Sequence, residues 1–196
     1  MLDKEKILGV CGILMPIIAY SFIFLAILIA PWFSWTDNAL SDLGVHQNSD
    51  IIFNSGLMIS GLLLMIFSFG LYSIFEDRYS KIGAIILIFT ALALFNIGVF
   101  PETTGKIHTY ISVLFFILFP IGYFMLGLSS FKKRRNTRVP IIVMFSAFLA
   151  ILIWFFPWKS FGIHGVAIPE FLSSLIGSIW LIYLGLKLYK KRIIIN

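Results

Sequence analysis

The sequence carries little charge and almost no cysteine. Only 12% of its 196 residues are Asp, Glu, Lys or Arg, whereas 60% are hydrophobic and the mean hydropathy is +1.00. A soluble domain has about 25% charged residues, so this composition excludes a water-soluble fold of this size. The single cysteine, Cys11, excludes an intrachain disulfide and a cysteine cluster for a metal. The remaining class is a protein whose apolar surface faces lipid.

Long apolar runs fill most of the chain. Each is close to the roughly 20 residues that an α-helix needs to cross the hydrocarbon layer. Their continuity does not fit the alternating pattern of a β-barrel. We therefore predict an all-α membrane helix bundle of six transmembrane helices, arranged as three hairpins in a single transmembrane domain over residues 1–196. The predicted segments are approximately 7–31, 51–75, 82–100, 108–131, 139–157 and 168–187.

The basic residues predict how the helices are oriented. Every Lys and Arg except Lys106 and Lys159 falls at one set of segment ends, including the run "FKKRRNTR". Because positive residues favour the cytoplasmic side, both termini are predicted to be cytoplasmic in a multi-pass protein of the cell membrane. The same placement accounts for the net charge of +6 without a nucleic acid partner.

The opposite segment ends carry the polar stretches "PWFSWTDNALSDLGVHQNSD", "VFPETTGKIH" and "FFPWKSFGIH". The first predicts a short interfacial helix that is capped by Thr36 or Asp37 and ends at Gly44. Its aromatic residues are typical of a membrane-interface anchor. Ionisable groups placed against a bundle interior need partners, so Ser41 and Asp42 are candidates for a polar pocket at the outer face.

Each polar stretch supplies one histidine, and all three are expected at one depth: His46, His108 and His164. Zinc accepts three imidazoles plus a water, whose pKa then falls to about 7. In the resulting hypothesis of a zinc-dependent hydrolase, Asp42 or Glu102 orients a histidine or acts as general base, and Ser41 hydrogen-bonds a substrate oxygen. The alternative is that the histidines are separate interfacial or capping residues, because no HxxxH pairing is present.

Two glutamates at this side adjoin a proline. Pro169-Glu170 is typical of the first turn of a helix, where proline is tolerated and an acid suits the helix dipole. We therefore interpret Glu170 as structural. Glu102 follows the end of a helix and gains nothing from a dipole, which makes it the better functional candidate.

Three functions stay open from the residues alone. An enzyme would cleave a lipid-derived ester or amide that enters from the bilayer. A non-enzymatic protein would bind or transport a lipid or another small molecule at the outer face, although no charge is expected at mid-bilayer, where coupling sites lie in transporters. A haem or quinone protein would use two histidines as axial ligands.

The motifs "WTDNALSDLG", "FNSGL", "GVFPETTGKIHTYISVLFF" and "IPEFLSSLIG" resemble the family catalogued as domain of unknown function 998, over nearly the whole chain. This resemblance implies one membrane domain of about six helices without an assigned activity. The sequence is more loosely similar to membrane hydrolases related to alkaline ceramidases. That similarity implies zinc chemistry by the residue types found in Ser41, Asp42, His46, His108 and His164. The chain differs from those hydrolases in having six segments rather than seven and no HxxxH in its last helix.

Overall fold

The computed structural model describes residues 3–133 and 137–191, and within these ranges the chain forms helices and no strands. Three short 3-10 helices that bear on the site region are η1 (Leu40–Gly44), η2 (Glu102–Thr104) and η4 (Trp158–Phe161). The long helices are α1 (Lys4–Leu28), α2 (Ser49–Ile74), α3 (Arg78–Val99), α4 (Lys106–Lys132), α5 (Arg138–Leu152, extended by the 3-10 turn η3, Ile153–Phe155) and α6 (Ala167–Tyr189).

All six long helical segments are long and apolar enough to cross a membrane. The prediction of an all-helical bundle with six spans is therefore confirmed, and the helix ends differ from the predicted segments by a few residues. The helices form because each run is continuous and apolar, and lipid leaves a backbone no hydrogen-bond partner outside its own helix.

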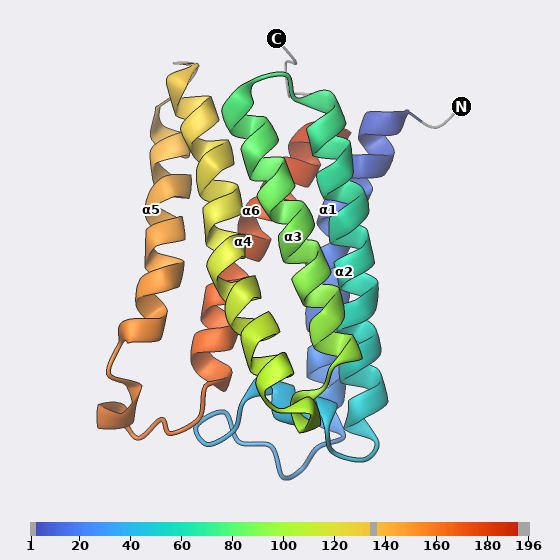
Figure 1. Ribbon diagram of the computed structural model, residues 1–196, viewed down its shortest axis with the longest axis vertical. Coiled ribbons are helices and arrows are strands. Elements are labelled where there is room, and N and C mark those ends of the chain that lie inside the picture. Colours follow the sequence, from blue (N-terminus) through green and yellow to red (C-terminus); the bar gives the residue numbers. More distant parts are fainter. Residues whose placement is uncertain (1–2, 134–136, 192–196) are drawn as a thin grey trace.

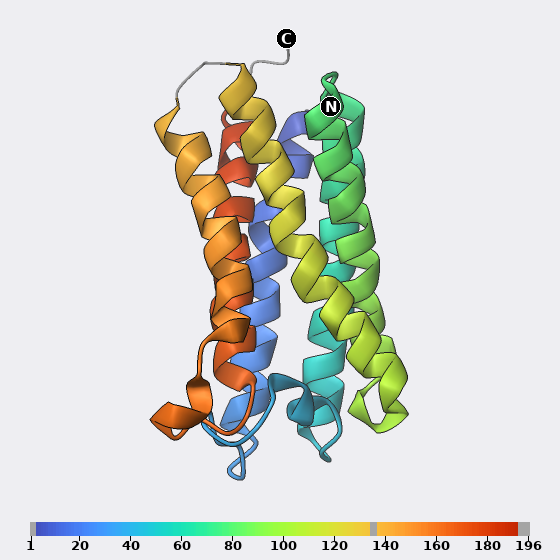
Figure 2. The ribbon, with the colours of Figure 1, turned by 60° about the vertical axis from the view of Figure 1, so that its left-hand side comes forward.

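The helices pack as a bundle with both chain ends at the same end (Figure 1). Successive helices α1 to α4 pack against one another, α6 packs against α1, and α5 lies at the edge against α4. The connections 29–48, 100–105 and 153–166 gather at the opposite end, which we call the site end (Figure 2).

Helices α1 and α6 approach most closely through two glycines. A Cβ on Gly9 would lie 2.6 Å from the carbonyl oxygen of Gly185, and a Cβ on Gly185 would lie 2.7 Å from the carbonyl oxygen of Gly9. Because lipid tails are as apolar as the helix surface, such close backbone packing holds membrane helices together. Helix α6 is thereby fixed beside α1.

The first site-end connection is clamped to the last one by backbone hydrogen bonds. His164 and Gly165 donate their N–H groups to the Thr36 carbonyl at 2.6 and 2.7 Å. Two further N–H groups, at the start of α6, donate to the Asn38 carbonyl. This clamp holds η1 against the first turn of α6.

The short helix of the first connection begins later than predicted. It starts at Leu40 instead of following Thr36 or Asp37, and it ends at Gly44 as expected. Asp37 does not cap it, because its carboxylate accepts from the hydroxyls of Ser34 and Thr36.

Candidate functional site

Three carboxyl groups from three different segments lie together at the site end: Asp42 of η1, Glu102 of η2 and Glu170 of α6. The Asp42 and Glu102 carboxyls interact with each other, and both interact electrostatically with Glu170. We call these three residues the carboxyl cluster. The structure thus brings together two predicted site residues and one that was interpreted as structural.

Asp42 is held by its own connection. Its Oδ2 accepts a hydrogen bond from the Asn38 side-chain amide at 2.8 Å and one from the Ala39 backbone N–H at 2.9 Å. Both donors lie just before η1, so the start of this short helix sets the position of the carboxylate. Because the carbonyl of Asn38 also accepts from the start of α6, the same residue links the clamp to the cluster.

Glu102 carries a strongly perturbed carboxyl group. Burial, the hydrogen bond with Asp42 and the Asp42 charge raise the pKa of Glu102 to about 7, while the Ser41 hydroxyl acts against them. The Ser41 Oγ lies 3.5 Å from Glu102 Oε2, at the limit of a hydrogen bond. Repulsion from the Asp42 charge thus favours the protonated form of Glu102 near neutral pH.

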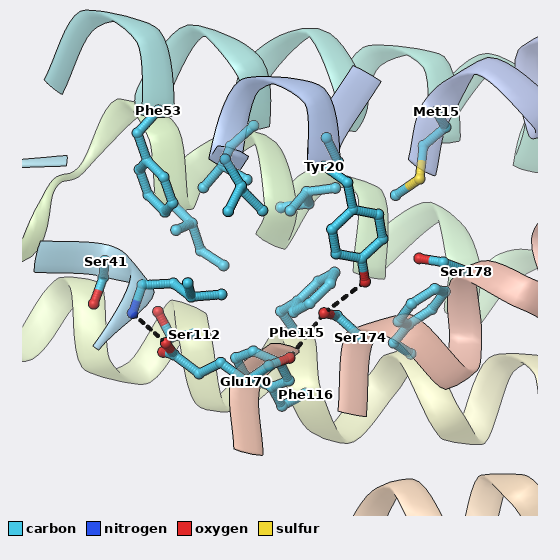
Figure 3. A pocket seen from close by; sticks show the side chains of 17 residues that line it. Met15, Tyr20, Ser41, Phe53, Ser112, Phe115, Phe116, Glu170, Ser174 and Ser178 are labelled. Carbon is cyan, nitrogen blue, oxygen red and sulfur yellow. Dashed lines mark hydrogen bonds between the residues drawn. The ribbon is translucent and has the colours of Figure 1, made fainter. Parts of the chain in front are cut away.

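Glu170 is buried, with 9% of its surface exposed. Its Oε2 accepts the backbone N–H of Leu40 at 2.7 Å (Figure 3). Glu170 does lie in the first turn of α6 as the sequence indicates, but its side chain turns into the bundle and reaches η1. Glu170, Ser174 and Ser178 are spaced four residues apart, which places them on one face of α6. This spacing is the signal in the sequence for a polar helix face that turns into the bundle.

No basic side chain neutralises the cluster within the part of the chain that the structure describes. The salt bridges there join Lys133 to Asp77 and Lys191 to Asp3, and these pairs lie at the end of the bundle that holds the chain termini. Lys106 and Lys159 lie at the site end without forming an ion pair. The cluster therefore has up to three negative charges that only protons or a bound group can offset.

An apolar cavity of about 70 Å³ extends from the cluster into the bundle. Its polar lining at the site end comes from Ser41, Ser112 and Glu170 (Figure 3). Its walls are otherwise dominated by aromatic and aliphatic side chains of the four helices α1 to α4, together with Leu40. These residues are Met15, Ala19, Ile23, Phe53, Leu57, Leu94, Ile97, Phe115, Phe116 and Phe119.

A second polar group lies deeper in the same cavity. The Tyr20 hydroxyl and the Ser174 hydroxyl are 3.0 Å apart, and Ser174 donates to the Glu170 carbonyl at 2.8 Å (Figure 3). Each of these two hydroxyl groups has a hydrogen-bond partner, so neither is left unpaired among the apolar walls. The cavity is therefore polar at the cluster and mainly apolar beyond it.

The three histidines have separate surroundings. His46 is exposed and packs on Trp32, with ring centroids 4.0 Å apart. His164 is also exposed and is held in the clamp by its backbone N–H. His108 is buried, and its Nδ1 lies 2.8 Å from the Phe100 carbonyl, which can only accept.

The tautomer of His108 follows from that contact. The Phe100 carbonyl requires a proton on Nδ1, and in that tautomer Nε2 can accept from the Ser112 hydroxyl at 3.3 Å. In the described ranges 3–133 and 137–191, no group of three or more His, Cys, Asp or Glu side chains is placed to hold a metal ion. The zinc site of His46, His108 and His164 thus stays a prediction that this geometry does not support.

Comparison with known proteins gives one match. The model of a family described as "Protein of unknown function (DUF998)" matches residues 13–187. No curated protein and no solved structure matches the chain. The looser resemblance to alkaline-ceramidase-related hydrolases therefore stays a prediction.

Proposed function

The chain belongs to the family described as protein of unknown function (DUF998), and from its site we propose that this multi-pass membrane protein binds a slim, lipid-like molecule. The hydrocarbon part would occupy the cavity, and the polar part would lie at the carboxyl cluster. One observation carries the proposal, namely that the mainly apolar cavity has its carboxyl group at one end, in Glu170. Ligand sites combine apolar walls with a few placed polar groups in this way.

The size of the cavity limits the ligand. An apolar cavity of about 150 Å³ admits benzene, so about 70 Å³ accepts the leading part of one chain and excludes a bulky ring system. Flexible wall residues such as Met15 would have to move for a longer chain to enter. A single-chain amphiphile fits these walls better than a lipid with two chains side by side.

Photochemical labelling tests this function. The purified protein in phosphatidylcholine nanodiscs is irradiated with a diazirine-bearing dodecanol, and the labelled peptides are identified by mass spectrometry. We expect label on cavity residues of α1 and α4, such as Met15 and Phe119. Label confined to lipid-facing residues would overturn the proposal.

Two variants of one helix provide the matched control. Ser112→Leu adds a side chain inside the cavity, whereas Ser130→Leu adds the same side chain to an exposed position of α4. We expect Ser112→Leu to reduce cavity labelling several-fold and Ser130→Leu to leave it unchanged. Equal labelling of the two variants would contradict binding in the cavity.

Hydrolysis of the bound molecule is a second candidate function. It is favoured by the contact among Ser41, Asp42 and Glu102, since a protonated carboxyl beside an acceptor carboxyl can serve as an acid–base pair. Incubation with a single-chain ester in nanodiscs would release the free acid if this function holds. The product should be lost in Glu102→Gln and kept in Asp50→Asn, a change to an acid at the same end outside the cluster.

A further inference from the structure

Two independent features of the molecule meet at Glu170. The first is the cavity, which its side chain lines, and the second is the carboxyl cluster, to which it belongs. Asp42 and Glu102 do not line the cavity themselves. They lie beside Glu170 and add negative potential at the one point where a bound molecule can touch a carboxyl group.

Among the residues that the structure describes, none of opposite charge forms an ion pair with the carboxyl cluster. A buried carboxylate is costly unless it is paired or hydrogen-bonded, and Glu170 receives one backbone donor, from Leu40. The described salt bridges lie at the other end of the bundle. Protons therefore offset part of this charge, as the raised pKa of Glu102, about 7, indicates. A ligand that carries its own positive charge would replace those protons.

The hydroxyl groups around Glu170 suit an ammonium group. An alkylammonium has three N–H donors and no acceptor, so it needs acceptors on several sides. The cavity offers the Glu170 carboxylate together with the Ser41 and Ser112 hydroxyl oxygens. A carboxylate headgroup would instead be repelled by the negative potential of the carboxyl cluster.

We propose that the cavity binds a cationic single-chain amphiphile, a long-chain amine, with its ammonium group at Glu170 and its chain among Phe53, Phe115 and Phe119. This inference rests on the proposed function and specifies its ligand. The aromatic walls would contact the hydrocarbon chain of the ligand, and the carboxyl cluster would favour a positively charged headgroup.

Competition against the diazirine-bearing dodecanol tests the charge preference. Dodecylamine, unlabelled dodecanol and dodecanoate are added separately at pH 7, and the label on cavity peptides is measured. For each competitor, the concentration that halves the cavity label is compared between protein variants in identical phosphatidylcholine nanodiscs. Partition of that competitor into lipid is the same in both samples and cancels from the ratio. A charged hydrogen bond in a buried site is worth about tenfold or more, so we expect dodecylamine to compete at about tenfold lower concentration than dodecanol.

Glu170→Gln removes the charge but keeps an oxygen for Leu40. We expect it to abolish the preference for dodecylamine while dodecanol still competes. Asp50→Asn should retain the preference, because Asp50 lies at the same end outside the cluster. Circular dichroism of both variants verifies that the helices are intact.

The possible outcomes distinguish failure of the cationic-ligand proposal from failure of the proposed binding function. Equal competition by amine and alcohol, with the cavity still labelled, would overturn the cationic ligand and leave the binding function standing. Stronger competition by dodecanoate would also overturn it. Failure of the probe to label the cavity in the wild-type protein would overturn both.

Discussion

The backbone N–H of Leu40 donates to Oε2 of Glu170 across 2.7 Å, although the two residues are 130 positions apart in the sequence. The bond joins η1 to the first turn of α6 and so fixes the mouth of the cavity. It gives Glu170 a structural role besides its place in the carboxyl cluster, and the two roles can be separated by substitution.

Glu170→Ala should be less stable than Glu170→Gln. The alanine variant leaves the buried N–H of Leu40 without an acceptor, which costs about 1–3 kcal/mol, whereas glutamine keeps a side-chain oxygen in place. Thermal unfolding of both variants in the same detergent measures the difference. Equal midpoints would mean that the Leu40 bond contributes nothing to stability.

The raised pKa of Glu102 predicts how stability changes with pH. The carboxyl has a pKa of about 7 in the folded protein and 4.5 as its ordinary value, so the folded state holds the extra proton between these values. The free energy of unfolding therefore falls as the pH rises from about 4.5 to about 7, and Glu102 adds no further change above that window.

Comparison with Glu102→Gln isolates this contribution. Because the carboxyl is partly exposed and water screens it, we expect the wild type to lose about 1–2 kcal/mol relative to the variant across the window. Chemical unfolding at pH 5 and pH 8 measures the difference, and Asp50→Asn serves as the control. Parallel pH profiles for the wild type and Glu102→Gln would contradict the raised pKa of Glu102.

Gly165→Ala should loosen the clamp between the first and last site-end connections. A Cβ at this position would meet the Asn38 carbonyl oxygen and the Asp37 backbone, so the connection must move. We expect faster amide hydrogen exchange at His164 and Ala167, and a several-fold loss of cavity labelling. Lys159→Ala, at an exposed position of the same connection, should change neither. Unchanged amide exchange in Gly165→Ala would mean that the clamp accommodates the methyl group, and it would contradict this prediction.

Gly9→Ala and Gly185→Ala should each destabilise the bundle by about 1–3 kcal/mol, because the new methyl group would overlap backbone atoms of the facing helix. Gly127→Ala is the matched control, since its Cβ would meet only side-chain atoms of Val143 and Met144, at 3.0 Å or more. Unfolding in detergent ranks the three variants. A larger loss in Gly127→Ala than in the other two would contradict the close α1–α6 contact.

Part of the candidate site could be read from the sequence. Ser41, Asp42 and Glu102 were singled out because polar residues beside long apolar segments need partners, and the structure brings them into contact. Glu170 was interpreted as structural, and it does bond Leu40 from the first turn of α6, but a helix dipole does not predict its place beside Asp42 and Glu102. The spacing of Glu170, Ser174 and Ser178 on one face of α6 was the available signal for a polar wall.

Depth alone was a poor guide to the histidines. His46, His108 and His164 share one end of the bundle, but their contacts differ. His46 packs on Trp32, His108 bonds Phe100 and Ser112, and the backbone N–H of His164 bonds Thr36. Residues at one depth can face any direction around a bundle, so depth does not bring imidazoles together.

The sequence by itself determined the six membrane spans and the concentration of basic residues at one end of the bundle. Both depend on local hydropathy and on the cost of moving charge into lipid. Only the tertiary structure decided that Asp42, Glu102 and Glu170 share one cluster at the mouth of a cavity. That meeting depends on the path of three connections and on how closely α6 packs against α1, which no local pattern in the chain encodes.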